Sequence, residues 1–388
     1  MKLKLFLFSL ILFALICGCY PQDGPIKAEK PPLEDQISAG ENTTADSGQE
    51  RSAGPKAAVN GKIKVHYLNV GQADSILIQT PAGKNILIDG GNSSDGDAVV
   101  RYLESQGVQR LDAVVATHPH ADHIGGLPRI LSAFPVANIY FPNAIHTTRT
   151  YENFLRAVNA SGAKRIRARA GLKLELDPDV EAAILAPGGD SYEKLNNYSV
   201  VLRIEYGNTS FLFTGDAEAE SENQMLAGGH LLKSDVLKVG HHGSSTSTTQ
   251  SFLSAVSPKY AVISVGAGNS YGHPSQRVLA SLASRGITVY RTDQSGTIVA
   301  TSDGETISFD KKASPIKPHA PPAASAGTAV SKAAPAAQSA PTARETIFVT
   351  RTGKKFHREG CRYLAKSKIP ISRQDVAARG YSPCSVCF

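Results

Sequence analysis

The sequence has few cysteines and few long hydrophobic runs. Only five cysteines occur in 388 residues, and none lies between Cys19 and Cys361. A central domain held together by disulfides is therefore excluded, because such a framework needs paired cysteines inside the domain. The one long apolar run follows two N-terminal lysines and covers about a dozen residues, which is short for a membrane-spanning helix.

That N-terminal run has the pattern of a secretory signal. The residues Ile16-Cys17-Gly18-Cys19 at its end resemble the lipobox of bacterial lipoproteins. We therefore expect residues 1–19 to be a lipoprotein-type signal peptide with Cys19 as the lipid anchor, so that the protein is extracytoplasmic and attached to a membrane. An ordinary cleaved signal, which would give a secreted protein, is the alternative.

Two segments rich in Pro, Ala, Gly and Ser divide the rest of the chain. Residues 20–60 and 311–344 contain few large apolar side chains, so they cannot bury enough surface to offset the entropy of ordering. We expect a disordered tether and a Pro/Ala-rich linker there. They enclose a domain at 61–310, which is long enough to bury its own core. The last segment, 345–388, carries nine Lys and Arg against three Asp and Glu. This excess suits an anionic partner such as nucleic acid, or serves solubility alone.

Alternating apolar residues predict strands along the central domain, with helices between some of them. The expected strands are 63–68, 75–78, 85–88, 111–116, 199–205, 209–214 and 235–239, and the expected helices are 97–106 and one from about 217. This order suggests two sheets with helices outside.

Side chains that bind metals recur where these predicted strands end. The motif HxHxDH follows the strand at 111–116, an aspartate follows FLFTG, and two histidines follow LKVG: these are His118, His120, Asp122, His123, Asp216, His241 and His242. Imidazole and carboxylate are the usual ligands of zinc and related divalent ions. The spacing lets His118 and His120 face one ion while Asp122 and His123 face a second.

Together with LNVGQADSILIQTP, ILIDGG, NNYSVVL, LKVGHHGSSTS and NSYGHPS, these residues resemble the metallo-β-lactamase superfamily. The resemblance is closest to the nuclease-like domain of ComEC-type competence proteins, and it spans almost the whole of 61–310. It implies an α/β fold, a four-layered αββα sandwich with a dinuclear metal site. A long transmembrane array is not seen in this sequence, so we expect a free-standing, anchored relative.

The resemblance also implies a role for each ligand residue. Two divalent ions, zinc or manganese, are expected, the first held by His118 and His120 and the second by Asp122 and His123. Asp216 would bridge them. One of His241 and His242 would complete the second site, and we favour His241 slightly.

Two further features follow from the resemblance. Asp89 would orient a ligand histidine through its ring N–H, although a turn residue before Gly90-Gly91 is the alternative. Many members supply another histidine to the first ion where this sequence has residues 196–199, Asn-Asn-Tyr-Ser. Amide and hydroxyl oxygens are weaker ligands, so the identity of the metal stays open.

Two such ions would lower the pKa of a shared water and give a metal-bound hydroxide near neutral pH. We therefore predict a metal-dependent hydrolase, a phosphodiesterase or nuclease that acts on DNA outside the cytoplasm. The alternatives are hydrolysis of a lactone, β-lactam or phosphocholine-type ester and, in another class, an anchored non-catalytic DNA-binding protein. No protein partner is evident.

Several polar residues are candidates for contact with the substrate. Asp122 and His273 are the predicted catalytic residues, with His273 either binding a phosphate oxygen or protonating the leaving group. A loop histidine bonded to backbone is the alternative for His273. The candidate substrate contacts are Asn197, Ser199, Ser244 and Ser245, of which the last two could instead form a simple polar turn.

The C-terminal segment carries the pattern HxxxC followed by CxxC, formed by His357, Cys361, Cys384 and Cys387. Three thiolates and one imidazole are typical of a structural zinc site, which would supply much of the folding free energy of so short a module. A disulfide between Cys384 and Cys387 is the alternative. The segment resembles the Ada-type metal-binding module. The residues predicted to contact DNA phosphates are Lys354, Lys355, Arg358 and Arg362.

Overall fold

The computed structural model describes residues 59–316, 347–350, 353, 355–358, 361–365, 367–371 and 381–384. The chain divides into two compact units between Lys317 and Pro318, inside the predicted linker. The predicted signal peptide with Cys19, the tether up to residue 58, Lys354 and Cys387 lie outside the described residues. Among the described residues, none of the helices has the length and apolar character to cross a bilayer.

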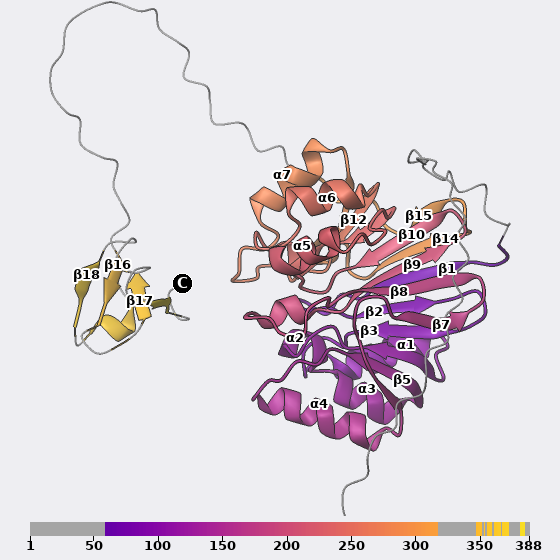
Figure 1. The fold of residues 1–388 in the computed structure, drawn as a ribbon, viewed down its shortest axis with the longest axis horizontal. Helices are drawn as coiled ribbons and strands as arrows, with labels where there is room; N and C mark the ends of the chain where they lie inside the picture. Colours follow the sequence, from indigo (N-terminus) through magenta and orange to yellow (C-terminus); the bar gives the residue numbers. More distant parts are fainter. Residues whose placement is uncertain are drawn as a thin grey trace, which may run out of the picture. The chain divides into compact units, whose positions relative to one another are not determined.

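The larger unit contains two sheets (Figure 1). The first has the strand order β15-β14-β1-β2-β3-β4-β5-β6 and comprises β1 (Ile63–Tyr67), β2 (Ile76–Gln79), β3 (Asn85–Ile88), β4 (Leu111–Val115), β5 (Val136–Phe141), β6 (Lys164–Arg167), β14 (Ile298–Ser302) and β15 (Ile307–Phe309). The second has the order β13-β12-β11-β10-β9-β8-β7 and comprises β7 (Lys173–Asp177), β8 (Val180–Ala186), β9 (Val201–Tyr206), β10 (Thr209–Phe213), β11 (Val236–Lys238), β12 (Tyr260–Ile263) and β13 (Thr288–Arg291).

Helices cover the outer face of each sheet. The first sheet packs against α1 (Gly96–Ser105), α3 (Leu127–Ala133) and α4 (Arg149–Ala160), and the second against α5 (Ala219–Ala227), α6 (Gln250–Val256) and α7 (Gln276–Ser284). Two shorter helices, α2 (Ala121–Ile124) and α8 (Thr292–Ser295), follow β4 and β13. The predicted four-layered αββα sandwich is thus confirmed.

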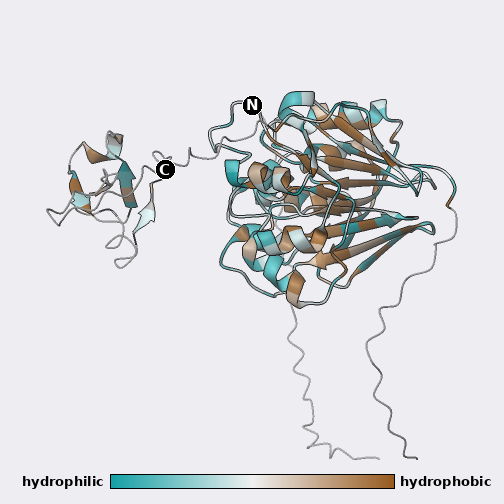
Figure 2. Ribbon diagram, turned by 90° about the horizontal axis from the view of Figure 1, so that it is seen from above, coloured by the Kyte–Doolittle hydropathy of each residue, from teal (hydrophilic) through white to brown (hydrophobic). Residues whose placement is uncertain are grey.

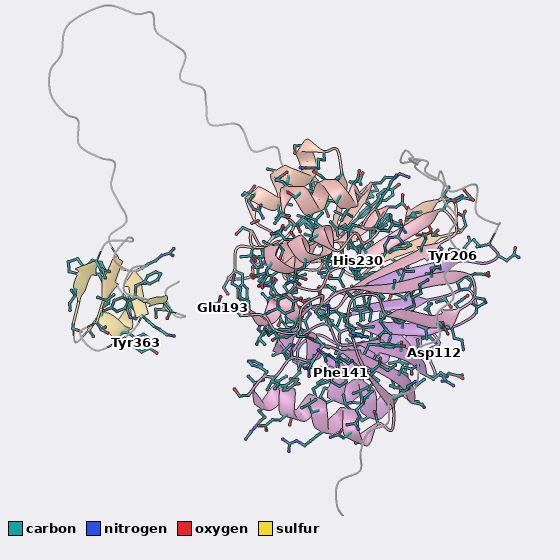
Figure 3. The ribbon with its side chains drawn as sticks, in the orientation of Figure 1. Asp112, Phe141, Glu193, Tyr206, His230 and Tyr363 are labelled. Atoms are coloured by element: carbon teal, nitrogen blue, oxygen red, sulfur yellow. The ribbon has the colours of Figure 1, made fainter. Side chains whose placement is uncertain are left out.

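Alternation along the strands explains this layering. In β2, Ile76 and Ile78 lie between the two sheets while Leu77 lies under the helices, because successive side chains of a strand point to opposite faces. Both faces of the central strands are buried, so these strands are mostly apolar, as the brown colouring in Figure 2 shows, whereas the edge strands β6 and β7 carry charged residues. Tyr206, labelled in Figure 3, is one of the large side chains that fill the space between the sheets.

The direction of the strands decides where polar residues collect. Strands β3 to β6 are parallel neighbours in the first sheet, and β10 to β13 are parallel neighbours in the second. The carboxyl ends of parallel strands meet at one edge of their sheet. The segments after β3, β4 and β5 therefore lie side by side, as do those after β10, β11 and β12.

The predicted elements agree with the observed ones to within about two residues. The predicted strand at 199–205 is β9, which begins at Val201 after a 3₁₀ turn, Leu195–Tyr198. Residues 311–316, assigned to the linker from composition, still belong to the larger unit, because Ser314 donates its backbone N–H to Val289 O on β13. Its hydroxyl also accepts from the backbone of Arg291.

The smaller unit is a four-stranded sheet of order β18-β16-β17-β19. Its strands are β16 (Ile347–Val349), β17 (Lys355–Arg358), β18 (Ile369–Ile371) and β19 (Ser382–Pro383). Strands β16 and β17 pair antiparallel, with Phe348 opposite His357. Its described core consists of Phe348, Cys361, Leu364 and Cys384.

Candidate metal centre

Four ligand-type side chains converge between the carboxyl ends of β4, β10 and β11. The ligand atoms of Asp122, His123, Asp216 and His242 all lie within 4.8 Å of one another. His123 Nε2 is 3.4 Å from Asp216 Oδ1, and His242 Nε2 is 3.3 Å from Asp122 Oδ2. The first sheet supplies two of these residues and the second sheet the other two, so the group forms only when the sandwich is assembled.

The hydrogen bonds of this group leave lone pairs directed inward. His123 Nδ1 donates to Asp89 Oδ2 at 2.7 Å, and His242 Nδ1 donates to the carbonyl of Ser264 at 3.0 Å. Both Nε2 atoms and Asp216 Oδ1 are buried and make no hydrogen bond among the described residues. Leaving buried polar atoms unpaired costs about 1–3 kcal/mol each. A divalent cation would satisfy all three atoms at once, so these residues fit the predicted metal.

The charges of these four side chains also indicate a cation site. Burial disfavours a positive charge on His123, but Asp216, Asp122 and Asp89 together raise the pKa of its ring well above the ordinary value. Burial alone would raise the pKa of Asp122, whereas the neighbouring His123 and His242 hold it below its usual range. The clustered carboxylates therefore favour positive charge at this point, which is what a cation site requires.

Asp89 lies behind His123 at the end of β3. Its carboxylate accepts hydrogen bonds from His123 Nδ1, from the backbone N–H of Thr117 at 2.8 Å and from Thr117 Oγ1 at 2.7 Å. Burial raises the pKa of Asp89, an effect that His123 opposes. The residue adopts a left-handed backbone with φ 57°, a costly conformation for a non-glycine residue. This is the geometry of a carboxylate that fixes the ring of a ligand histidine.

A second pair of ligand atoms belongs to His118 and His120. His118 Nε2 lies 2.9 Å from His120 Nδ1, so the two nitrogens could face one ion. His118 Nδ1 lies 3.1 Å from Thr117 Oγ1 and 3.4 Å from Ser199 Oγ. Burial and then the nearby His123 lower the pKa of His118 well below its usual value, which keeps the ring in the neutral form that binds metals.

The two histidines after β11 diverge. Both have left-handed backbones, with φ 50° at His241 and 52° at His242. His242 joins the buried group, while His241 Nδ1 points to Thr246 Oγ1 at 3.1 Å and to Glu218 Oε1 at 3.5 Å. His241 Nε2 lies 3.6 Å from Asp216 Oδ2. The geometry thus favours His242 for the second site and reverses the slight preference for His241 taken from the sequence.

Asn197 and Ser199 were expected to contact the substrate, but both are buried and bonded within the protein. Asn197 Oδ1 accepts from the backbone N–H groups of Glu218 and Ser221 at the start of α5. Ser199 Oγ accepts from the backbone N–H of Asp216 at 3.0 Å and lies beside His118. Ser199 therefore contacts two ligand residues and Asn197 holds the start of α5, and both side chains are at most 2% exposed, which leaves no surface for a substrate.

A cavity of about 400 Å³ opens over the centre. It is lined by Gln72, His120, Ala121, Asp122, His146, Thr148, Thr150, Asp216, His241, His242, Tyr271 and His273. His273 Nδ1 lies 3.4 Å from Gln72 Nε2, and its backbone is held by Asn269. Burial, with His241 and His242 nearby, lowers the pKa of His273 to about 4. A ring that is neutral near pH 7 suits hydrogen bonding to a phosphate better than protonation of a leaving group.

The two serines after Gly243 do not line this cavity in the described structure. Ser244 is buried and its hydroxyl bonds to Thr246 Oγ1 at 3.0 Å. Ser245 is exposed, and its carbonyl accepts from Arg277. Their observed contacts are those of a polar turn.

Some residues at the centre had not been singled out from the sequence. Gln72, His146 and Tyr271 line the cavity from loops, where spacing carries no signal. Lys238 and Asp74 form a buried ion pair behind His242, with Nζ and Oδ2 2.8 Å apart. The lysine inside the apolar run of β11 could have indicated this ion pair from the sequence, because a fully buried lysine needs a charged partner.

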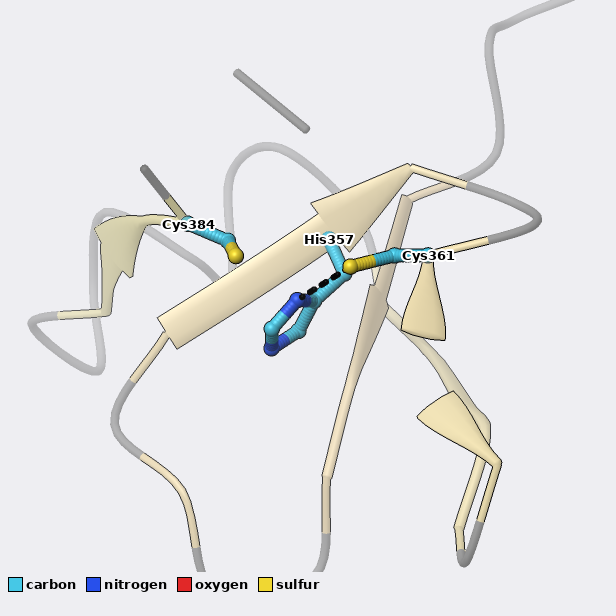
Figure 4. Close-up of side chains that lie close together, drawn as sticks. All are labelled: His357, Cys361 and Cys384. Carbon is cyan, nitrogen blue, oxygen red and sulfur yellow. Dashed lines mark hydrogen bonds between the residues drawn. The ribbon is translucent and has the colours of Figure 1, made fainter. Parts of the chain in front are cut away.

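The smaller unit carries a separate group. Ligand atoms of His357, Cys361 and Cys384 lie within 4.8 Å of one another, and His357 Nδ1 is 3.3 Å from Cys361 Sγ (Figure 4). The fourth predicted ligand lies outside the described residues. Lys355 and Arg358 are exposed on β17, while the side chain of Arg362 is not described.

Comparison with known proteins identifies relatives of the larger unit. The family model described as Metallo-beta-lactamase superfamily matches residues 68–267. ComE operon protein 3 of Bacillus subtilis (strain 168) is 34% identical over 252 residues, which cover 61% of this chain and 32% of that protein. Competence protein ComA of Neisseria gonorrhoeae is 34% identical over 247 residues, which cover 63% and 33%. The chain thus matches about a third of the length of these relatives.

Shorter and more distant similarities also occur. A hydroxyacylglutathione hydrolase of Vibrio parahaemolyticus serotype O3:K6 (strain RIMD 2210633) is 37% identical over 68 residues, 18% of this chain and 25% of that protein. Among solved structures, Zn(2+)-bound PqqB from Methylobacterium extorquens aligns with a TM-score of 0.39 and 13% identity, covering 58% of this chain and 97% of that one.

Proposed function

Because the chain belongs to the metallo-β-lactamase superfamily and has competence proteins of the ComEC type as homologues, we propose that it is a phosphodiesterase that cleaves DNA outside the cytoplasm. The superfamily makes it a metal-dependent hydrolase; the substrate and the location are the proposal. The observation that carries it is the cavity over the centre, whose rim presents hydrogen-bond donors from Gln72, Thr148, Tyr271 and His273. Such a rim suits the charged oxygens of a phosphodiester.

Each ligand residue has a place in this proposal. Asp122, His123 and His242 would hold one ion, His118 and His120 the other, with Asp216 between the two. His241, whose Nε2 lies 3.6 Å from Asp216 Oδ2, is the candidate for a further ligand of the ion held by His118 and His120. Divalent ions held by these residues would lower the pKa of a bound water and stabilise charge on phosphoryl oxygens.

Other residues orient the reacting groups. Asp122 is the most accessible carboxylate of the buried group, with 32% of its side chain exposed. Its carboxylate oxygens can accept a hydrogen bond from the attacking water and hold it toward the substrate. The ring N–H of His273 and the amide of Gln72 can donate to non-bridging phosphate oxygens. These contacts bind and align the diester while the buried histidines stay fixed by Asp89 and Ser264.

The ends of the chain extend the proposal. The N-terminal pattern supports export and attachment to a membrane through Cys19. The smaller unit would hold a structural zinc through His357, Cys361, Cys384 and Cys387, and the exposed Lys355 and Arg358 could then meet DNA phosphates. This unit would thus add affinity for DNA without taking part in the chemistry.

Hydrolysis of a small ester or thioester by the same centre is the second candidate. Its support is the local similarity to hydroxyacylglutathione hydrolases, which covers under a fifth of the chain. The competence homologues match more than three times as much of the chain, which favours the phosphodiester.

Purified full-length protein loaded with zinc or manganese can decide between these substrates. It would be assayed on plasmid DNA, bis-p-nitrophenyl phosphate, a chromogenic cephalosporin and a thioester, each with and without chelator. We expect cleavage of the two phosphodiesters, lost on chelation and in His242→Ala but kept in the matched control His230→Ala, which lies outside the centre. Turnover of the cephalosporin or thioester without phosphodiester cleavage would overturn the proposal.

A further inference from the structure

A second cavity, of about 190 Å³, lies beside the carboxyl end of β6. Its polar lining comes from Arg167 at the end of that strand, Arg169 just beyond it, Asn143 from the segment after β5, and Asp190 and Tyr198. The two arginines and Asn143 are exposed. The lining thus offers two guanidinium groups and an amide to solvent.

The topology puts this cavity next to the metal centre. Strands β4, β5 and β6 are parallel neighbours, so their carboxyl ends share one edge, and HxHxDH follows β4 on that edge. Neighbouring strands lie about 4.8 Å apart, which sets the end of β6 roughly 10 Å from the end of β4. Measured along the helix axis of B-form DNA, that distance corresponds to about three phosphates of one strand.

One loop borders both cavities. The connection from β5 to α4 places Asn143 in the second cavity and His146 in the cavity over the centre. The rings of His146 and His120 are 6.1 Å apart between centroids, which ties this loop to the ligand residues. A chain molecule lying over the centre would therefore continue past the loop toward Arg167 and Arg169.

The charges in the second cavity are available to a ligand. The guanidinium of Arg169 makes no hydrogen bond or ion pair within the described structure. Arg167 pairs with Asp190 at 2.8 Å, but the Asp190 side chain is 96% exposed, and such surface pairs contribute little. Guanidinium groups bind phosphates through paired donors, and Asn143 can add an amide donor.

We propose that this second cavity binds backbone phosphates of a polynucleotide whose scissile phosphodiester lies over the metal centre. The inference rests on the proposed function and narrows it, because a site for distant phosphates selects polymers over small diesters. Basic residues on an edge strand also discourage pairing between sheets. That role concerns the strand itself, whereas Arg169 lies beyond the end of β6 and lines the cavity.

The test compares a polymer with a small diester. Arg167→Gln and Arg169→Gln would be made in the full chain, with Arg165→Gln as the matched control. Arg165 lies on the same strand, is bonded to Asn159 Oδ1 at 2.7 Å and does not line the cavity. Thermal unfolding of each variant verifies that it folds.

We expect turnover of bis-p-nitrophenyl phosphate to stay unchanged in all three variants. With a labelled oligonucleotide, Arg167→Gln and Arg169→Gln should raise KM roughly three- to tenfold, as expected for a lost charge-assisted hydrogen bond in an exposed site. The slope of log affinity against log salt should also fall by about one for each lost phosphate contact. Arg165→Gln should behave as the unaltered protein does.

Two results would overturn the inference. One is an equal effect of Arg169→Gln and Arg165→Gln on the oligonucleotide, and the other is a loss of small-diester turnover in Arg169→Gln. If the unaltered protein cleaves neither diester, the proposed function fails, but fluorescence polarisation of the oligonucleotide still tests the cavity. Binding that weakens in Arg169→Gln and not in Arg165→Gln would then support it, and equal binding would refute it.

Discussion

The buried ion pair between Lys238 and Asp74 allows a direct test of how much one buried interaction contributes to the free energy of unfolding. Lys238 Nζ lies 2.8 Å from Asp74 Oδ2, and neither side chain is more than 2% exposed. Lys238 also donates to the carbonyl of Val239, and Asp74 Oδ1 lies 3.5 Å from His242 Nδ1. The pair therefore stands directly behind a ligand histidine.

The contact geometry sets the magnitude. At 2.8 Å and an effective dielectric constant of 20, the attraction is about 6 kcal/mol before desolvation is subtracted. Removing one member of a buried pair typically costs about 3–5 kcal/mol, because the other charge is left uncompensated. We expect Asp74→Asn and Lys238→Met each to lower the free energy of unfolding by that amount. The double variant should recover most of the loss, because neutral replacements of a buried pair are often tolerated.

Urea unfolding of the full chain, followed by circular dichroism, measures these values, since the sequence has no tryptophan for fluorescence. A chelator in all samples keeps changes in metal binding from contributing. Lys259→Met is the matched control, because Lys259 pairs with Asp235 at the surface and is 75% exposed. Its loss should cost less than about 1 kcal/mol. If Lys238→Met costs no more than Lys259→Met, or if the double variant shows the full sum of both losses, the reasoning is refuted.

Three further predictions concern the centre and pH. Asp89→Asn should weaken zinc binding about 10- to 100-fold in chelator competition, because the orienting carboxylate is lost; unchanged affinity would contradict this role. In elemental analysis, His242→Ala should retain less metal than His241→Ala, and equal retention would remove the distinction between them. Burial, with a smaller effect from Lys64, lowers the pKa of His66 to about 4. As the pH falls below about 6.5, His66 therefore takes up a proton in the unfolded chain but not in the folded chain. Stability should therefore fall by about 3 kcal/mol from pH 6.5 to 4 through this residue, and His66→Asn should flatten that part of the pH profile.

The sequence predicted best what is decided locally. The strands follow from alternation, and HxHxDH gathers four ligand-type residues in one turn after β4, so both could be found without the structure. The segments after parallel strands must meet at one edge of their own sheet, which places Asp89 beside the turn after β4 and Asp216 beside the histidines after β11. The family resemblance was needed to join the two sheets.

Contacts between distant segments could not be predicted. The choice between His241 and His242 depends on two successive left-handed residues, and no residue type announces that conformation for histidine. Ser199 looked accessible in NNYSVVL, yet it lies between Asp216 and His118, which stand 17 and 81 positions away in the chain. A polar residue that is buried to position another resembles, in sequence, one that is exposed to bind a substrate.

The division of ligands between the sheets connects metal binding to the fold. His118, His120, Asp122 and His123 come from the end of β4, while Asp216 and His242 come from the second sheet. An ion bound to both sets would link the sheets at their edge and would stabilise the folded chain in proportion to its affinity. The core between the sheets must in turn hold their spacing, because ligand distances tolerate errors of only about 0.2 Å. A core substitution that shifts one sheet against the other should therefore reduce metal affinity before it abolishes folding.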